Sequence, residues 1–360
     1  MQNNQLRNWS ISLLAASLFF SCQKEITTVP EGDKTQVTQS GTGGNFWASL
    51  PVPLIPVSGP PTADLYNQSF SVNDKLYVVV RGYNQLWKYD PVTAQWTLTQ
   101  NSFYNFDNTG FEPVFTYGNV IYFLNAGGKI LKAYDTRTGV WTNKSNFPGS
   151  ATFDYISTAT DSKGWIISGD TRSTTVPQGN PTSQNWQYDF INDSWTQKAP
   201  TPGLARFNAA GYSVGDKIYF GTGASETLVI NPITFQISHR NVINADWWEY
   251  NTTLDTWTQR TNYGGGVRQD TRGFVIGGQV YLGMGSSGFF VDLKSDFWSY
   301  DPVTNSWTRR ASYPPGNGYP PYNTMTGASQ RGYAITETIG SFWRYTPSYI
   351  IFPTAQIKEP

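Results

Sequence analysis

The sequence predicts an all-β fold, a six-bladed β-propeller with four antiparallel strands in each blade. Three observations predict it: a unit containing a Tyr and a Trp recurs along the chain, hairpin-like segments lie between its copies, and the composition suits short strands joined by turns. The 360 residues include 34 Gly and 22 Pro, with 16% aromatic and only 14% charged residues. An average globular protein has roughly 25% charged residues.

The recurring unit places a Trp seven residues after a Tyr. Its five complete copies are LWKYDPVTAQW (86–96), LKAYDTRTGVW (131–141), NWQYDFINDSW (185–195), WWEYNTTLDTW (247–257) and FWSYDPVTNSW (297–307). The pairs are Tyr89/Trp96, Tyr134/Trp141, Tyr188/Trp195, Tyr250/Trp257 and Tyr300/Trp307. A sixth copy, FWRYTP (342–347), contains Tyr345 but has no Trp at position 352. The Tyr residues of successive copies are 45, 54, 62, 50 and 45 residues apart. A repeat of about 50 residues indicates a propeller or a solenoid.

Each unit is expected to form two hairpins. Alternation in Trp-x-Tyr places both rings on the same face of a strand. Asp-Pro-Val-Thr after Tyr89 and Tyr300 favours a turn. The next strand is expected to open with the second Trp. Further hairpins are predicted at 69–80, 212–223 and 274–285, with Asn-Asp, Gly-Asp and Gly-Gly turns that tolerate positive φ. Four antiparallel strands make one propeller blade. The Tyr and Trp rings are therefore expected to pack between blades rather than to form a platform for sugars.

The sixth unit lacks a fourth strand, and an unmatched copy of such a strand occurs at 46–51 (FWASLP). This copy resembles the strand expected at the end of another blade, Trp195–Pro200. We therefore expect Trp47 to lie in an N-terminal strand that completes the sixth blade and closes the propeller. A closed arrangement leaves no exposed sheet edge. The alternative is that Tyr349–Phe352 supplies the fourth strand.

The unit resembles the kelch repeat, most closely that of the kelch-repeat lipoproteins of Bacteroidetes. The likeness is greatest at Asp246–Trp257 and Asp296–Trp307, and it extends over residues 46–347. It implies a kelch-type propeller like that of galactose oxidase. The copper chemistry of such oxidases requires a Tyr cross-linked to a Cys together with His ligands. With one Cys and one His in the whole chain, that site is not expected here.

The N-terminus is predicted to be a lipoprotein signal peptide, residues 1–21. Arg7 precedes the apolar run 11–20, which is about half the length of a membrane-spanning helix. Cys22, the only cysteine, follows this run and Ser21, which resembles the lipobox whose Cys is acylated. The alternative is an ordinary secretory signal with a free Cys. Residues 22–45 are then the lipidated Cys and a polar tether, whose last 23 residues would reach on the order of 25 Å.

These features predict a lipoprotein of the Gram-negative outer membrane that contacts the membrane only through its acyl anchor. The segment Gln23-Lys24-Glu25 resembles the surface-export signal of Bacteroidetes lipoproteins, so we expect surface exposure, with a periplasm-facing protein as the alternative. Twenty-five basic and 25 acidic residues give a formal charge of zero. A nucleic-acid partner is not expected, because such binding requires a basic surface.

Two motifs look catalytic, and neither is expected to be so. Gly283–Gly288 fits G-x-G-x-x-G, but a dinucleotide site also requires a following helix, and here another strand is expected. His239 has no suitably spaced partner residue. We expect no metal and no cofactor, because zinc sites generally need several Cys or His ligands.

A ligand is expected on the face that carries the long insertions. These insertions, 169–184, 222–246 and 284–296, lie between the second and third strands of blades three to five. Long polar loops on a rigid scaffold are where binding residues concentrate. Candidate ligand contacts on this face are Arg206, Arg268, Arg272, Tyr319 and Tyr322. The alternative for the arginines is that they brace neighbouring blades.

The sequence therefore favours a non-enzymatic binding module for a glycan or a protein. A sugar epimerase of the sialic-acid mutarotase kind is the alternative, because some exported bacterial kelch propellers are such enzymes. It would need an acid–base pair in the central pocket. The carboxylates available for it are Glu226, Glu249, Asp270 and Glu337. A purely structural role also remains open.

Overall fold

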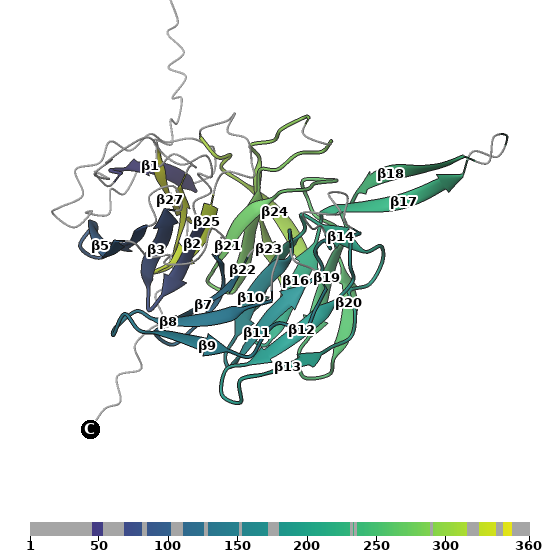
Figure 1. Cartoon of the computed structure of the whole chain (residues 1–360). Helices are drawn as coiled ribbons and strands as arrows, with labels where there is room; N and C mark the ends of the chain where they lie inside the picture. Colours follow the sequence, from purple (N-terminus) through teal and green to yellow (C-terminus); the bar gives the residue numbers. More distant parts are fainter. Residues whose placement is uncertain are drawn as a thin grey trace, which may run out of the picture. The chain divides into compact units, whose positions relative to one another are not determined.

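Twenty-seven strands and no helix make up the part of the chain that this computed structural model describes (Figure 1). The described residues are 45–52, 68–80, 85–101, 111–125, 129–150, 153–171, 180–230, 233, 236–288, 291–314, 324–335 and 341–347. All of them lie in the second of the chain's two units, Thr35–Pro360. A search of these residues for an apolar helix long enough to cross a membrane finds none.

Within the described residues the strands form six four-stranded antiparallel sheets and one three-stranded sheet. Sheets one to six have the strand orders β2-β3-β4-β5, β6-β7-β8-β9, β10-β11-β12-β13, β15-β16-β19-β20, β21-β22-β23-β24 and β25-β26-β27-β1. The first strands are β2 (Gln68–Val72), β6 (Phe111–Tyr117), β10 (Ile156–Thr160), β15 (Ala210–Val214), β21 (Arg272–Ile276) and β25 (Thr324–Ala328). The second strands are β3 (Lys75–Val80), β7 (Val120–Asn125), β11 (Lys163–Ile167), β16 (Lys217–Gly221), β22 (Gln279–Gly283) and β26 (Arg331–Ile335).

The third and fourth strands carry the repeated aromatic residues. The third strands are β4 (Gln85–Asp90), β8 (Leu131–Asp135), β12 (Asn185–Asp189), β19 (Trp247–Asn251), β23 (Phe297–Asp301) and β27 (Phe342–Thr346). The fourth strands are β5 (Gln95–Asn101), β9 (Trp141–Lys144), β13 (Ser194–Gln197), β20 (Thr256–Arg260), β24 (Ser306–Arg310) and β1 (Phe46–Leu50). The three-stranded sheet consists of β14 (Arg206–Phe207), β17 (Ala224–Ile230) and β18 (Ile237–Ile243).

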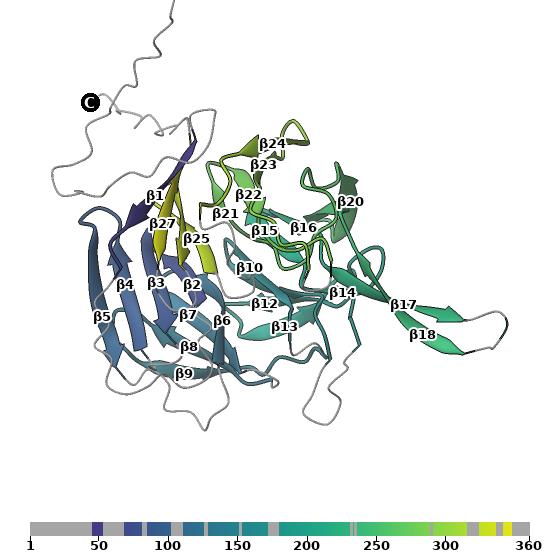
Figure 2. The same ribbon diagram turned by 90° about the horizontal axis from the view of Figure 1, so that it is seen from above.

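Neighbouring sheets meet along their first strands (Figure 2). β2 contacts β6, β6 contacts β10, β10 contacts β15, β15 contacts β21, β21 contacts β25, and β25 contacts β2. The strands approach closely where one of them has a Gly. A Cβ added to Gly211 of β15 would lie 2.2 Å from the Cγ2 of Ile156 in β10. The close approach of sheets three and four therefore requires glycine at this position.

The predicted hairpin turns form as expected. Asn73 and Asp74 connect β2 to β3 with φ of 47° and 58°, and Gly277 and Gly278 connect β21 to β22 with φ of 55° and 77°. Two consecutive residues with positive φ form the turn whose twist matches that of the flanking strands. At the 212–223 hairpin, Gly215 has a φ of 58°.

Each predicted Tyr–Trp pair lies directly opposite across the third and fourth strands. The ring centroids are 5.0 Å apart for Tyr89 and Trp96, and all six sheets have such a pair. In sheet six the pair is Trp47 with Tyr345. The other pairs are Tyr134/Trp141, Tyr188/Trp195, Tyr250/Trp257 and Tyr300/Trp307. All six Tyr rings are buried, as packing between the sheets requires.

The structure corrects the prediction for Trp195 in two respects. Trp195 does not open its strand, because β13 begins one residue earlier and ends at Gln197, short of the predicted end at Pro200. Its ring is also only half-buried, whereas packing between blades was expected to enclose it. The physical reason is that β13 is the outermost strand of sheet three, so one side of the ring remains open to solvent.

The buried side of Trp195 still contacts the preceding sheet. Its ring centroid lies 5.0 Å from that of Phe147, and its Nε1–H donates to the Ser145 carbonyl at 2.9 Å. The same half-burial is found for the other Trp residues of the complete copies, Trp96, Trp141, Trp257 and Trp307. In the five complete copies, therefore, the Tyr belongs to the core and the Trp forms the boundary of the core, whereas Trp47 of sheet six is fully buried.

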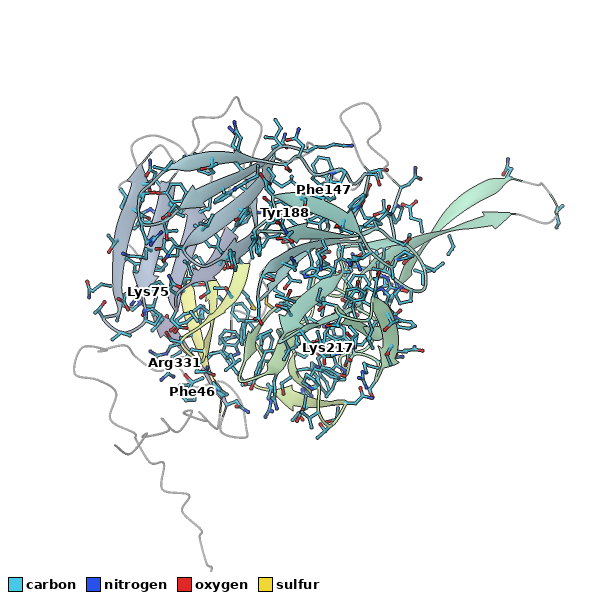
Figure 3. All side chains as sticks on the ribbon, turned by 90° about the horizontal axis from the view of Figure 1, so that it is seen from below. Phe46, Lys75, Phe147, Tyr188, Lys217 and Arg331 are labelled. Carbon is cyan, nitrogen blue, oxygen red and sulfur yellow. The ribbon has the colours of Figure 1, made fainter. Side chains whose placement is uncertain are left out.

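Between the sheets, side chains of one face pack against those of the next (Figure 3). Phe147, which follows β9 of sheet two, lies beside Tyr188 of sheet three in one apolar cluster. Burying an aromatic side chain of this size contributes about 1.5–3 kcal/mol relative to leaving it exposed. The core is therefore divided into the spaces between successive sheets.

Hydrogen bonds join each Tyr–Trp pair to the preceding sheet. In sheet four, the Tyr250 hydroxyl donates to the carboxylate of Asp255, which also accepts the backbone N–H of Ala199 from the end of sheet three. The Trp257 Nε1–H donates to the Ala199 carbonyl at 3.1 Å. Asp255 has a φ of 55°, a conformation that Asp and Asn tolerate better than most residues. We call this arrangement the Tyr–Trp staple.

The staple recurs in sheets three and five. Asp193 accepts the Tyr188 hydroxyl and the Ser145 N–H, and Asn305 accepts the Tyr300 hydroxyl and the Thr261 N–H. The Trp part of it also occurs at both sides of β1. Trp47 donates to the Ala311 carbonyl after β24, and Trp96 donates to the Pro51 carbonyl after β1. β1 therefore has the contacts of a fourth strand.

We expect the loss of β1 to destabilise the fold. Deleting residues 23–40 leaves β1 intact and should not change the melting temperature. Deleting residues 23–52 removes β1 and the fully buried Trp47, and truncating such a Trp alone typically costs about 3–5 kcal/mol. Thermal and urea unfolding of both deletion variants measures the difference. Equal stability of the two variants would show that β27 does not depend on β1.

Candidate functional site

The candidate site lies at the end of the sheets where second strands end and first strands begin, which we call the loop face. The three predicted insertions are found there, between β11 and β12, between β16 and β19, and between β22 and β23. The first of them is partly tied down, because Asp170 forms bridges with Phe153 and Pro181. The third is tied through Ser286, which bridges Gln269 and Leu293.

The second insertion forms a β-hairpin and not the loop that the sequence suggested. β17 and β18 pair along seven residues each and project away from sheets four and five (Figures 1 and 2). Only the base of β17 is held by a third strand, because β14 pairs with Ala224 and Ser225 alone. We call β17 and β18 together the ribbon.

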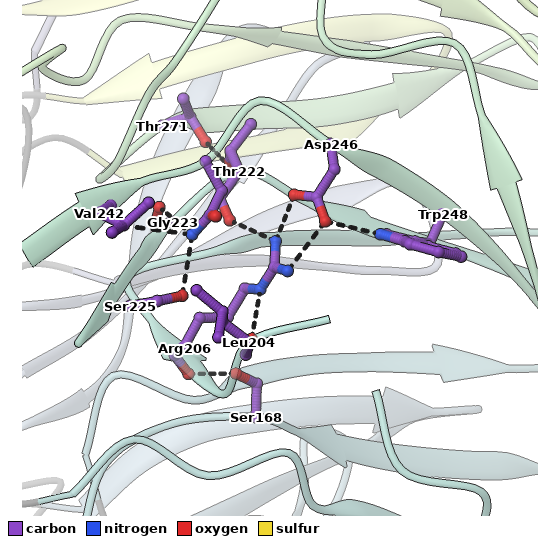
Figure 4. Close-up of polar contacts among 11 residues, drawn as sticks. Ser168, Leu204, Arg206, Thr222, Gly223, Ser225, Val242, Asp246, Trp248 and Thr271 are labelled. Atoms are coloured by element: carbon purple, nitrogen blue, oxygen red, sulfur yellow. Dashed lines mark hydrogen bonds and ion pairs between the residues drawn. The ribbon is translucent and has the colours of Figure 1, made fainter. Parts of the chain in front are cut away.

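Arg206, a predicted ligand contact, is buried under the loop face with 1% of its surface exposed (Figure 4). Its guanidinium forms a bidentate ion pair with Asp246, with Nη1–Oδ1 and Nη2–Oδ2 distances of 2.5 and 2.9 Å. Nη1 also donates to the Thr222 carbonyl and Nε to the Leu204 carbonyl. The indole N–H of Trp248 donates to the same carboxylate at 2.7 Å.

Arg268 repeats this arrangement one sheet further on, and it is 2% exposed. Its guanidinium pairs with Asp296 at 2.8 and 3.2 Å and donates to the carbonyls of Met284 and Gly265. The Trp298 indole N–H donates to Asp296 at 2.7 Å. Each guanidinium therefore pairs with its own carboxylate, Asp246 or Asp296, and the two guanidiniums share no acceptor among these bonds.

Each arginine also joins two sheets through its backbone. The Arg206 carbonyl accepts the N–H of Gly169 at 3.0 Å and the hydroxyl of Ser168, both from sheet three. The Arg268 carbonyl accepts the N–H of Gly223 from the second insertion at 2.7 Å. For these two residues the contacts favour the bracing alternative.

The charge of the arginines controls the ionisation of their partners. Burial by itself raises the pKa of the Asp246 carboxyl, but the hydrogen bonds and the charge of Arg206 outweigh burial, so the pKa lies below its usual value. Asp296 is shifted downward in the same way by Arg268. A carboxylate whose folded-state pKa is depressed stabilises the fold above its unfolded-state pKa, and this stabilisation is lost as the pH falls through the folded-state value.

Of the remaining predicted ligand contacts, the structure describes Arg272 but not Tyr319 or Tyr322. Arg272 begins β21, is half-buried and donates to the Thr271 carbonyl at 3.0 Å. Tyr319 and Tyr322 lie outside the described residues, as do Cys22, Glu337 and the Tyr349–Phe352 segment. His239 lies in β18, opposite Leu228. Gly283 ends β22 and Ser286 forms a bridge, so the described part of the G-x-G-x-x-G segment contains no helix.

Sequence reasoning missed the partners of the arginines. Asp246 and Asp296 both stand two residues before the Trp of a Trp-x-Tyr strand, so Asp-x-Trp-x-Tyr is the signal that could have identified them. The buried state of Arg206 and Arg268 follows from these partners, because a buried guanidinium must be paired and hydrogen-bonded.

A second feature also escaped the sequence reading. Three consecutive loops each hold an Asp or Asn in the left-handed conformation, two residues before a first strand. These residues are Asp154, Asn208 and Asp270, with φ of 50°, 52° and 55°. The N–H of Asp270 donates to the Asn208 carbonyl at 3.1 Å, which joins neighbouring loops. Asp154 is exposed, whereas Asp270 is buried. Equivalent polar side chains thus occur at the start of the first strands in sheets three, four and five.

The three described carboxylates that were considered for acid–base chemistry lie in different elements. Glu249 lies in β19, where it accepts the Tyr219 hydroxyl and pairs with Arg260 at 2.6 Å. Glu226 belongs to the ribbon, and Asp270 precedes β21. Among the described residues, no group of three or more His, Cys, Asp or Glu side chains is placed to hold a metal ion.

Comparison with known proteins gives the fold. No protein-family model matches the sequence, and no curated protein does. Among 695 matching chains of solved structures is the structure of YjhT, with a TM-score of 0.56 over 83% of this chain and 95% of that chain. The two sequences are 13% identical, so the likeness concerns the fold alone. The chain folds as a kelch-like β-propeller.

We expect Arg206→Lys to destabilise the protein. Lys cannot form the bidentate pair, and breaking a buried ion pair from one side typically costs about 3–5 kcal/mol. Since Lys keeps the charge, the expected loss is somewhat smaller, about 2–4 kcal/mol in urea unfolding. Arg137→Lys is the matched control, because the Arg137 side chain is 67% exposed beside Asp135 and should change stability by less than about 0.5 kcal/mol. An equal loss of stability in the two variants would contradict the interpretation that Arg206 braces neighbouring sheets.

Proposed function

We propose that this protein is a non-enzymatic binding module that holds a glycan or a protein ligand at the loop face. The observation that carries the proposal is that three consecutive sheets bear long insertions there, and that buried Arg–Asp pairs fix the loops that lead into two of these sheets, four and five. Rigid elements that present variable loops are typical of binding sites. A held loop loses little conformational entropy when a ligand binds, which favours affinity.

We infer that the six four-stranded sheets are the six blades of a single propeller and that β1 closes it. The contacts between successive first strands support this inference, because they run from β2 through β25 and back to β2. The Trp contacts on both sides of β1 support it independently. Closure would keep the loop face continuous around the propeller axis.

The ligand contacts are proposed to be polar side chains near the first strands. Asp154, Asn208 and Asp270 occupy equivalent positions in three loops, and carboxylate or amide groups are suited to the hydroxyl groups of a sugar or the N–H groups of a peptide. Arg272, Tyr319 and Tyr322 remain candidate contacts from the sequence. Arg206 and Arg268 are proposed to act indirectly, by fixing the loops.

We propose further that the chain is anchored as a lipoprotein of the outer membrane, of the Bacteroidetes type. The apolar run 11–20 followed by Ser21-Cys22 and a polar segment supports acylation of Cys22. The charged residues after Cys22 support display at the cell surface, and a periplasm-facing protein is the alternative. In either position the propeller would remain soluble beside the membrane.

Acylation of Cys22 has a direct test. The variant Cys22→Ser removes the thiol that would carry the acyl chains, so the protein should leave the membrane fraction and take up no fatty-acid label. The conservative control Ser21→Ala keeps the thiol and should remain labelled. A wild-type protein that takes up no label, and a variant that stays in the membrane fraction, would exclude the anchor.

The loop face is tested by binding of the full chain to a glycan array and, separately, to immobilised surface proteins. Asp154→Ala should weaken binding of the best ligand about 10-fold, as expected for the loss of one hydrogen bond to a charged group. Asp161→Ala is the matched control, because Asp161 is an exposed residue at the opposite end of the same strand, β10. It should leave binding unchanged.

Two outcomes would contradict the binding proposal. Equal loss of binding in both variants would place the ligand away from the loop face. If instead the chain accelerates the interconversion of sialic-acid anomers, followed by nuclear magnetic resonance, the protein is an enzyme and the mutarotase alternative replaces the binding module.

A further inference from the structure

The ribbon is the one element of the described chain that projects from the sheets without a core of its own (Figure 2). Its base is fixed, because Ser225 is fully buried and Asn244 donates to the Ser225 hydroxyl and to the Gly223 carbonyl. Beyond Ser225, β14 no longer pairs with β17, and the ribbon continues as two strands. A two-stranded ribbon is marginally stable in water unless something adds to it.

β18 is the edge strand of this sheet, and the register shows which of its backbone groups face outward. The Asn244 N–H donates to the Gly223 carbonyl, so residues 244, 242, 240 and 238 direct their backbone groups toward β17. Successive residues in an antiparallel strand alternate in this direction. The N–H and carbonyl groups of His239, Asn241 and Ile243 therefore point away from β17.

This edge has few of the features that usually prevent strands from pairing. The sequence ISHRNVI (237–243) contains no Pro, Gly, Lys or acidic residue, and Arg240 is its only permanent charge. Natural edge strands are commonly blocked by Pro, Lys, bulges or inward-pointing charges. The chain as a whole has a formal charge of zero, so copies do not repel one another at long range.

We propose that β18 is a self-association edge, at which the β18 strands of two copies of this chain pair antiparallel. Two ribbons would then form one continuous sheet across a two-fold axis, the commonest symmetry of homo-oligomers. Because the ribbon holds β18 away from the sheets, the β18 strands of two copies can pair before the sheets of the two copies collide. Among the described residues no strand pairs with the outer side of β18, and its outward backbone groups would be matched by those of an identical strand.

The side chains select one register. The outward-facing backbone groups of one β18 must pair with those of the other. The two registers that pair the most residues place the two-fold axis at Arg240 or at Asn241. An axis at Arg240 would place two arginines directly opposite, which destabilises an antiparallel pair. An axis at Asn241 places Arg240 opposite Val242 and His239 opposite Ile243. The proposed pairing is therefore centred on Asn241.

The register is tested by disulfide formation in the full chain. Cys22→Ser removes the only cysteine together with the acylation site. Adding Asn241→Cys should then give a disulfide-linked dimer, because hydrogen-bonded antiparallel partners have Cα atoms about 5.5 Å apart, which a disulfide can bridge. Val303→Cys is the matched control, because Val303 is 93% exposed in the turn after β23. Cross-linking of both variants at the same rate would overturn the proposal.

The edge itself is tested by sedimentation of the Cys22→Ser chain over a range of concentrations. Asn241→Pro removes the outward N–H and spares the bonds to β17, so it should leave a monomer with an unchanged melting temperature. Asn241→Ala keeps the N–H and should dimerise like its parent. His239→Pro provides a second edge variant if Asn241→Pro unfolds. A parent chain that is monomeric at all concentrations, or a dimer that survives both Pro variants, would overturn the proposal.

Discussion

The Tyr–Trp staple is the interaction on which the rest of the structure depends. A four-stranded sheet has two faces to cover, and here each sheet must hold its neighbours at a fixed distance along its outer part as well as along its first strand. The staple does this with one side chain: Asp193, Asp255 or Asn305 accepts a Tyr hydroxyl from its own sheet and a backbone N–H from the preceding sheet. Hydrogen bonds to a charged group, as with Asp193 and Asp255, contribute about 1.5–3 kcal/mol. In sheets three, four and five these bonds hold each sheet to the preceding one, and the aromatic side chains fill the space between them.

The sequence could predict this framework because its causes are local. A Tyr and a Trp seven residues apart in one hairpin become cross-strand partners through the turn between them, whichever sheet they belong to. The pairing of Trp47 with Tyr345 was predictable only because the repeat left one strand unmatched at each end. The half-burial of Trp195, which the Trp of every complete copy shares, follows from the place of β13 as the outermost strand of its sheet, and the sequence pattern alone does not show which side of that strand is covered.

The site was less predictable because its contacts join distant residues. The sequence left Arg206 and Arg268 open as ligand contacts or as braces, and the choice depends on Asp246 and Asp296, which follow them by 40 and 28 residues. Nothing near Arg206 in the sequence indicates that its charge is neutralised. The ribbon was missed for another reason. Its β-branched runs, ASETLVI and ISHRNVI, fall within an insertion between strands, where the repeat gives no expectation.

The Tyr–Trp staples and the Arg–Asp pairs divide the molecule into a framework that needs particular residues and a surface whose residues can be substituted. The staples and the Arg–Asp braces use buried groups, so their substitution affects stability first. Exposed residues such as Asp154, at the start of a first strand, carry little of the packing. A loop whose position is fixed from below by Arg206 or Arg268 can therefore change its outer side chains without losing its position. Under the proposed binding function, that separation would let one repeated framework present different surfaces to ligands. The framework can be predicted from the sequence because it is repeated, whereas the outer side chains follow no repeat.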